Sequence, residues 1–188
     1  RLPGVSEDEL RALEVAAAQG RVVHRAVWVR SSGMPPRVAD ALAETLVSYG
    51  FATPVPSGFV LDPELLTALR ERARVAERAA PHAGAVAVTL EHLGGDALQV
   101  ARCWRDAGES ARAARVLLDQ WHRVVRTHGT VVTASAIDEA RDWLFEVPEE
   151  EALHGRAAVV AAELRLETGK APEDEMRALQ AWALARGW

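Results

Sequence analysis

Residues that end helices recur at nearly constant intervals through the second half of the chain. Gly108, Gly129, Pro148 and Gly169 lie 21, 19 and 21 residues apart. Glycine adopts the left-handed conformation that closes a helix, and proline lacks the amide that would continue one. Each interval therefore holds one helix of about 17 residues and a short turn. Paired helices of this kind bury their apolar faces only by stacking, so the intervals predict an α-solenoid of helical hairpins.

Helix is also predicted for the rest of the chain after Leu61, because no later stretch alternates like a strand. Two helices recur about every 40 residues, which is longer than the roughly 34 residues of a strict tetratricopeptide repeat. A capping box from Ser135 to Asp138 predicts that one helix begins there. The predicted helices cover residues 63–80, 82–93, 96–107, 110–127, 135–146, 149–168 and 173–186.

The amino-terminal part of the chain, up to Asp62, differs because its helices precede the two convincing strand candidates of the sequence. A capping box at Ser6 and Glu9 begins the first helix, and Gly20 ends it. A tight turn from Pro56 to Gly58 joins the strands. Three helices followed by a β-hairpin is the order of a winged helix. The predicted elements are helices at Ser6–Gly20, Val22–Arg30 and Pro35–Tyr49, then strands at Phe51–Val55 and Gly58–Leu61.

These patterns predict a mainly α protein with a winged-helix-like domain at 1–62 and a tetratricopeptide-like helical repeat domain at 63–188. Trp121 and Trp143 are expected to pack as wedges between repeats, and Gly108 to take a left-handed or tightly packed turn position. Trp182 and Trp188 lie in a last repeat without a polar cap. We expect this apolar end to be covered either by the next repeat of a longer protein or by self-association with another copy of this chain.

Charge and composition narrow the classes of function. Residues 1–80 hold 10 basic and 10 acidic side chains, whereas residues 81–188 hold 12 basic and 17 acidic ones. The acidic half is expected not to bind DNA, because nucleic-acid affinity depends on neutralised phosphates. No apolar run approaches the roughly 18 residues that cross a bilayer, and the single Cys103 forms no internal disulfide. We therefore expect a cytoplasmic protein. Because the chain begins with Arg1, we also expect it to be a piece of a longer protein.

The motifs that carry catalysis are incomplete in this sequence. Gly169-Lys170-Ala171 lacks both the preceding glycine and the following hydroxyl of a phosphate loop. His122 and His128 lie about 240° apart around one predicted helix, so one metal ion could not bind both. Cys103 is expected to be buried beside Trp104, and the acidic runs at 149–151 and 173–175 are explained by helix dipoles. We therefore predict no enzyme, no cofactor and no metal.

Two segments carry a resemblance to known proteins. Residues 100–114 (VARCWRDAGESARAA) resemble a tetratricopeptide-like helix–turn–helix, and residues 140–150 (ARDWLFEVPEE) are similar to a segment in the sensor region of signal-transducing ATPases of the maltose-regulon-activator type. In that family a winged helix follows a nucleotide-binding module, and a superhelix then receives an inducer or an inhibitory partner. This chain contains neither the nucleotide-binding module nor the DNA-binding domain. The resemblance implies that this chain is an arm between adjoining domains. The arm would couple the ATPase module to the sensor.

Two functional hypotheses follow. The first is a regulatory fragment of a transcriptional regulator whose solenoid binds a protein partner or a small-molecule effector, without membrane or direct nucleic-acid contact. The second is a winged-helix DNA-binding regulator with a helical dimerisation or sensing domain. Its DNA contacts would come from the basic residues of the first domain, which are Arg21, Arg25, Arg30 and Arg37. The helix from Pro35 to Tyr49 argues against it, because its charges sum to −1.

Overall fold

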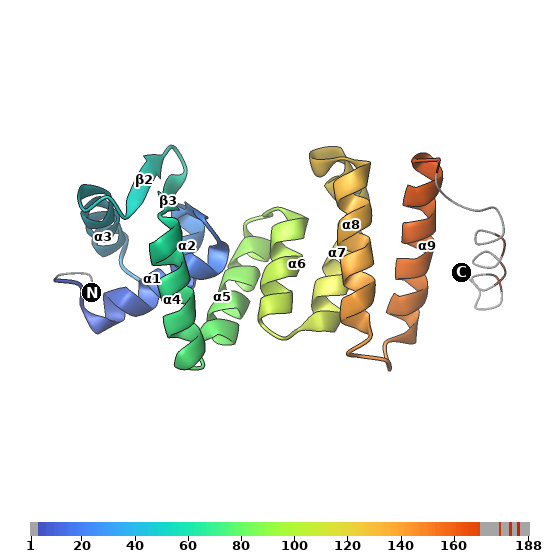
Figure 1. The fold of residues 1–188 in the computed structure, drawn as a ribbon, viewed down its shortest axis with the longest axis horizontal. Helices are drawn as coiled ribbons and strands as arrows, with labels where there is room; N and C mark the ends of the chain where they lie inside the picture. Colours follow the sequence, from blue (N-terminus) through green and yellow to red (C-terminus); the bar gives the residue numbers. More distant parts are fainter. Residues whose placement is uncertain (1–3, 170–176, 178–180, 182–183, 185–188) are drawn as a thin grey trace. The chain divides into compact units, whose positions relative to one another are not determined.

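The computed structural model describes residues 4–169 together with Arg177, Ala181 and Leu184. They are mainly helical, as predicted, and include a small three-stranded sheet (Figure 1). The chain divides into two compact units, Arg1–Gly95 with Asp106–Gly108 and Asp96–Arg105 with Glu109–Trp188. No helix in the described ranges is long and apolar enough to cross a membrane.

The first unit begins with α1 (Glu7–Gln19), which starts at the predicted capping box. The Ser6 hydroxyl accepts from the amide of Glu9 at 3.3 Å, and the Glu9 carboxylate accepts from the amide of Ser6 at 2.7 Å. Both amides would otherwise lack a partner at the helix start. The helix ends at Gly20 with φ of 112°, also as predicted.

The predicted helix at Val22–Arg30 is wrong in its first part. Val22–His24 form strand β1, and α2 begins only at Arg25 and ends at Ser32. Strand β1 pairs antiparallel with a segment that lies beyond two helices in the sequence, with Val23 opposite Phe59. Two adjacent valines favour a strand once such a partner is present, because their branched side chains pack well on a sheet.

Helix α3 (Pro36–Ser48) and the hairpin of β2 (Ala52–Val55) and β3 (Gly58–Leu61) follow as predicted. All strands pair antiparallel in the order β1-β3-β2, so β3 is central. The core beneath the sheet centres on Trp28, which is fully buried. Its indole N–H donates to the carbonyl of Ala12 at 2.7 Å, and its ring meets Phe59 edge-on at 5.2 Å.

Helices α4 (Pro63–Val75) and α5 (Ala79–His92) complete the first unit by packing on α1, and α5 also packs on α2. The boundary between the two compact units therefore follows Gly95, whereas the predicted domain boundary follows residue 62. The predicted helix at 63–80 is too long, because Glu77 with φ of 56° separates α4 from α5. Pro81 lies in the first turn of α5, where its missing amide has no cost.

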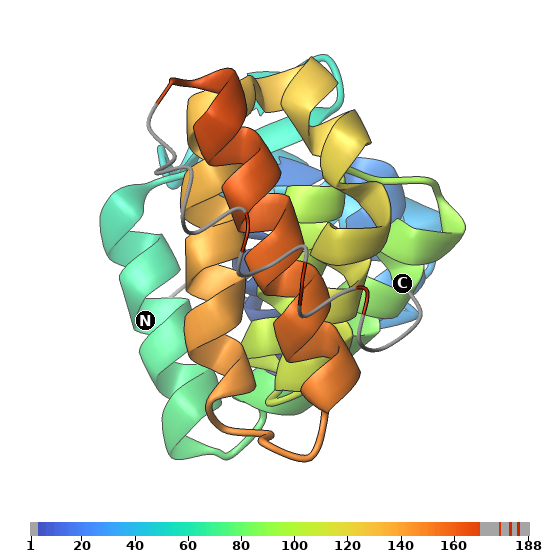
Figure 2. The ribbon, with the colours of Figure 1, turned by 90° about the vertical axis from the view of Figure 1, so that its right-hand side faces the viewer.

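The second unit consists of α6 (Ala97–Asp106), α7 (Ser110–His128), α8 (Thr130–Leu144) and α9 (Glu151–Glu167). Helix α9 packs against both α7 and α8 (Figure 2). The predicted start at Ser135 is wrong, because α8 begins directly after Gly129 and Ser135 is exposed within it. The single glycine, with φ of 84°, is enough to separate two long helices.

The core of the second unit holds the small and aliphatic side chains of all four helices, and Trp121 and Trp143 are half-buried against it. Trp104 is buried, with the Arg112 guanidinium 3.6 Å from its ring centroid. Gly108 has φ of 84°, as predicted for the turn between α6 and α7. The predicted helix at 173–186 is described only at three helical positions, and Trp182 and Trp188 lie outside the described residues.

Candidate functional site

The surface of α3 is the first candidate, because the DNA-binding hypothesis places it against bases. Ala39, Leu42 and Leu46 are buried in the first unit and fix which face of the helix points inward. The opposite face exposes Arg37, Val38, Ala41 and Glu44, with Val38 at 40% exposure. That face is mostly small or apolar, with one charge of each sign.

Arg25 and Asp40 form a bidentate ion pair between the start of α2 and α3. The guanidinium donates from Nε to Oδ1 at 2.5 Å and from Nη2 to Oδ2 at 2.7 Å. This hydrogen bonding lowers the pKa of Asp40 and raises the pKa of Arg25, so both groups stay charged. Of the four predicted DNA-contacting arginines, Arg25 is thus already occupied by a carboxylate of the helix that would read DNA.

The hydroxyls on α3 are also directed at the protein itself. Thr45 donates to the carbonyl of Ala41 at 2.8 Å, and Ser48 donates to the carbonyl of Thr45 at 2.8 Å. A hydroxyl bonded to the preceding helical turn has given its only proton to that bond. Neither residue is oriented to donate to a base edge.

The other three arginines of the DNA-binding hypothesis lie on different elements, and all three are exposed. Arg21 precedes β1, Arg30 is in the last turn of α2, and Arg37 is in the first turn of α3. They form no ion pair with any residue that the structure describes. The turn between β2 and β3, at Pro56 and Ser57, contributes no basic side chain.

A buried charge cluster around Glu14 is a feature that the sequence did not reveal. The Glu14 side chain has no exposed area, yet it lies in the middle of α1. Arg78 donates to both of its oxygens at 2.7 and 2.8 Å, and Arg72 Nε lies 2.9 Å from Oε1. His82 Nε2 is 3.1 Å from Oε2.

Burial acts to raise the pKa of Glu14, but the hydrogen bonds of Arg78 and His82 and the charges of Arg78 and Arg72 outweigh it. The pKa is therefore lowered, and the carboxylate stays ionised inside the unit. The cluster joins α1 to α4, to the turn after it and to α5. Its arginines and histidine lie far along the sequence from Glu14, so only the folded chain brings them together.

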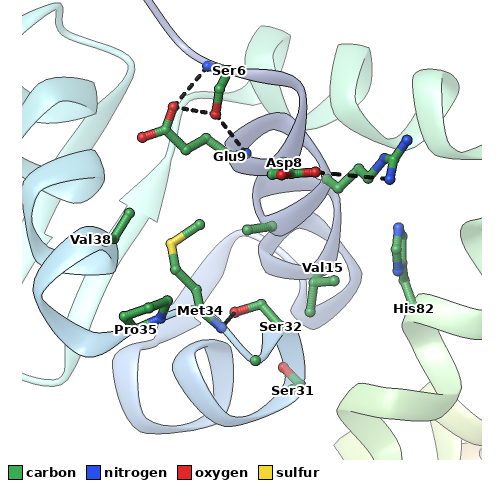
Figure 3. Close-up of a pocket in the computed structure, with 13 residues that line it drawn as sticks. Ser6, Asp8, Glu9, Val15, Ser31, Ser32, Met34, Pro35, Val38 and His82 are labelled. Atoms are coloured by element: carbon green, nitrogen blue, oxygen red, sulfur yellow. Dashed lines mark hydrogen bonds and ion pairs between the residues drawn. The ribbon is translucent and has the colours of Figure 1, made fainter.

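A pocket of about 550 Å³ lies between the start of α1 and the turn from α2 to α3. In Figure 3, Met34, Pro35 and Val38 line one side of the pocket. Val15 of α1 lines a second side, and His82 lines a third. It belongs to the first unit, whereas the effector-binding hypothesis placed the ligand on the solenoid.

The polar groups of this pocket are already engaged. Ser31 donates to the carbonyl of Val27 at 2.7 Å, so its hydroxyl is not activated by a base. Ser32 accepts from the amide of Met34, and Ser6 and Glu9 bind each other in the capping box. His82 turns Nε2 to Glu14.

Metal and thiol chemistry have little support in the described part of the chain. It contains no group of three or more metal-ligating side chains. Cys103, the single cysteine of the chain, is buried. His122 stacks on Trp121, whereas His128 lies 2.8 Å from Asp96, so the two histidines have different partners. The residue Lys170 of the incomplete phosphate loop lies outside the described residues.

Ion pairs connect the turns of the second unit. Arg105 donates to both carboxylate oxygens of Glu146, and the Ser110 hydroxyl donates to the same carboxylate at 2.8 Å. The hydrogen bonds of Arg105 and then Ser110 lower the pKa of Glu146. The turn from α6 to α7 is thereby connected to the end of α8. Comparisons of the chain with family models, with curated proteins and with solved structures found no match.

Proposed function

We propose that this chain is a non-catalytic regulatory module of a transcriptional regulator, which works by binding a protein partner or a small effector. In this proposal the first unit contains a winged-helix-like fold that does not read DNA. The second unit is a tetratricopeptide-like repeat that presents the partner-binding surface. Adjoining domains of a longer regulator would supply nucleotide binding and DNA recognition.

The element order supports the winged-helix part of the proposal. Helix α1, strand β1, helices α2 and α3 and the β2–β3 hairpin follow one another, with β3 central in the sheet. The sequence alone predicted this order without β1, and β1 adds a third strand to the predicted hairpin. Helices α4 and α5 then lie on α1, where the buried Glu14 holds them.

The observation that carries the proposal is the Arg25–Asp40 pair. A helix that reads DNA presents free donors to base edges and phosphates. Here Arg25, at the start of α2, is bound by the Asp40 carboxylate of α3 itself, and Glu44 adds a second carboxylate one turn further on. Two carboxylates at positions i and i+4 on one helix face would repel a phosphate backbone.

The second candidate is direct DNA binding, and one observation favours it. Arg21, Arg30 and Arg37 lie at the surface and form no ion pair in the described ranges of the chain. Arginines without partners can neutralise phosphates even when they contact no base. In this alternative the helical repeat would serve dimerisation or sensing.

Titration with a mixed-sequence DNA duplex at about 50 mM salt separates the two candidates, because low salt strengthens electrostatic binding. We expect no binding tighter than about 1 μM. Tighter binding that weakens steeply with salt and is lost in Arg37→Ala would establish the DNA-binding alternative. Arg102→Ala on α6 is the matched control, since Arg102 is also exposed but lies in the other unit.

A further inference from the structure

A row of arginines runs along one face of α7. The helix carries Arg112, Arg115, Arg123 and Arg126 but only one acidic residue, Asp119. At 100° per residue these five side chains fall within an arc of about 80°. Residues 81–188 are acidic as a whole, with 12 basic and 17 acidic side chains, so α7 concentrates positive charge in an acidic half.

The arginine face, as we name these four arginines, is accessible. All four residues are exposed, and Arg115 has 51% of its side chain accessible. Arg126 forms no ion pair within the described residues, and Arg115 lies 3.6 Å from Glu150 in a loose pair. The Arg112 guanidinium lies over the Trp104 ring, 3.6 Å from its centroid, and this contact orients it.

Helix stability does not account for this distribution. Carboxylates are favourable in the first turn of a helix and cations in the last. Helix α7 has no acidic residue in its first turn, and Arg112 lies near that end. Arg126 in the last turn is favourable for the helix, whereas Arg112 and Arg115 are not at the favourable end.

We propose that the arginine face binds an acidic helical segment of a partner protein. The arginines form two pairs, each with members three positions apart, and Arg123 follows Arg115 by eight positions. On the helix these intervals correspond to rises of about 4.5 Å within each pair and about 12 Å between pairs. A partner helix with carboxylates at the same intervals places one beside each arginine. The interval pattern reads the same in both directions, so it suits either helix orientation.

Asp119 favours a protein partner over a nucleic acid. It lies between the two arginine pairs on the same face, and Arg156 Nη2 of α9 donates to it at 2.7 Å. A continuous phosphate chain would meet this carboxylate, which is 53% exposed, at the middle of its path. A helix with two separated carboxylate pairs avoids it.

This inference rests on the proposed function, and its test uses the whole 188-residue chain. The probe is an alanine-based helical peptide whose four glutamates repeat the intervals of three, eight and three positions. A control peptide carries four consecutive glutamates, and a thymidine oligonucleotide carries the same four negative charges. Binding is followed by the NMR signals of the arginine side-chain N–H groups. Because exposed ion pairs are individually weak, we expect saturation by the matched peptide in the millimolar range.

The matched variants are Arg126→Glu on the arginine face and Arg102→Glu on α6, both at exposed positions in the same unit. We expect Arg126→Glu to weaken binding of the matched peptide at least about fivefold, and Arg102→Glu less than about twofold. Equal effects of the two variants, or equal affinity for the two peptides, would overturn the inference. Tighter binding of the oligonucleotide that is lost in Arg126→Glu would replace it with a nucleic-acid surface. None of these results depends on α3, so the proposed function is tested separately by Arg37→Ala.

Discussion

Gly58 begins β3 at a point where the backbone of β1 passes very close. A β-carbon at this position would lie 2.1 Å from the carbonyl oxygen of Val23 and 2.9 Å from the amide nitrogen of Arg25. Both are backbone atoms in a paired strand or directly after it, so they cannot move aside as a flexible side chain would. We expect Gly58→Ala to lower the free energy of unfolding by about 2 to 3 kcal/mol, measured by urea denaturation.

Gly50→Ala is the control for this prediction. Gly50 also has a positive φ, at 77°, but its β-carbon would meet no atom within 4 Å. Gly50→Ala should therefore lower the free energy of unfolding only by the conformational cost of about 1 kcal/mol. Equal losses at the two positions would show that the contact with β1 does not constrain Gly58.

Glu14 makes the stability of the first unit depend on pH. Its pKa is lowered in the folded state, so its contribution is fully present above the unfolded value of about 4.5 and is lost as the pH falls through the folded pKa. Glu14→Gln leaves Arg72 and Arg78 without their shared carboxylate. We expect a loss of about 3 kcal/mol at pH 7 and a weaker loss of stability on acidification than in the unchanged chain.

The comparison variant for Glu14 is Glu71→Gln. Glu71 also pairs with an arginine, Arg74, but its side chain is 55% exposed. Solvent screens such a pair, so its removal should cost far less. Thermal unfolding of both variants across pH 3 to 7 provides the measurement. A loss in Glu14→Gln no larger than in Glu71→Gln would contradict a structural role for the buried cluster.

At the scale of elements, the turn from α6 to α7 depends on a carboxylate at the end of α8. Ser110, at the start of α7, is buried and donates to Glu146, as does Arg105. We expect Glu146→Ala to speed amide hydrogen exchange in the first turn of α7. Glu139→Ala, at an exposed position of α8, should leave exchange there unchanged. Equal protection in the two variants would show that the contact does not hold the turn.

Local signals predicted the elements whose causes are local. The Ser6–Glu9 capping box, the glycine turns at 108 and 129 and the β2–β3 hairpin all follow from residues within a few positions. Strand β1 could not be predicted in the same way, because its partner β3 follows only after α2, α3 and β2. Ser135 shows the opposite error, since a capping pattern inside a continuous helix has no helix end to cap.

The candidate site also combines features that the sequence predicts with features that only the fold reveals. The low charge of α3 was evident from Asp40 and Glu44, but the pairing of Asp40 with Arg25 required the fold. The Glu14 cluster gave no sequence signal, because a glutamate in an alanine-rich helix is typical of a solvated face. Only the packing of α4 and α5 on α1 makes that position interior.

At the scale of the whole molecule, the separate cores predict separate folding. One core includes residues from Leu13 to Leu69, and the other extends from Ala97 to Leu164. A fragment of residues 1–95 should therefore unfold cooperatively by itself. A fragment cut after residue 62 should be much less stable, because it lacks Leu69 and exposes the face of α1 that α4 and α5 cover. Circular dichroism on heating distinguishes them, and equal stability would place the boundary at 62.

The central proposal is that carboxylates on α3 prevent the first unit from binding DNA. Its most direct test compares the unchanged chain with an Asp40→Asn, Glu44→Gln double variant in fluorescence-anisotropy titrations of one DNA duplex at about 50 mM salt. The variant frees Arg25 and removes both negative charges. We predict that it binds at least about tenfold more tightly than the unchanged chain. If the unchanged chain binds as tightly as the variant, with the same salt dependence, the account is contradicted.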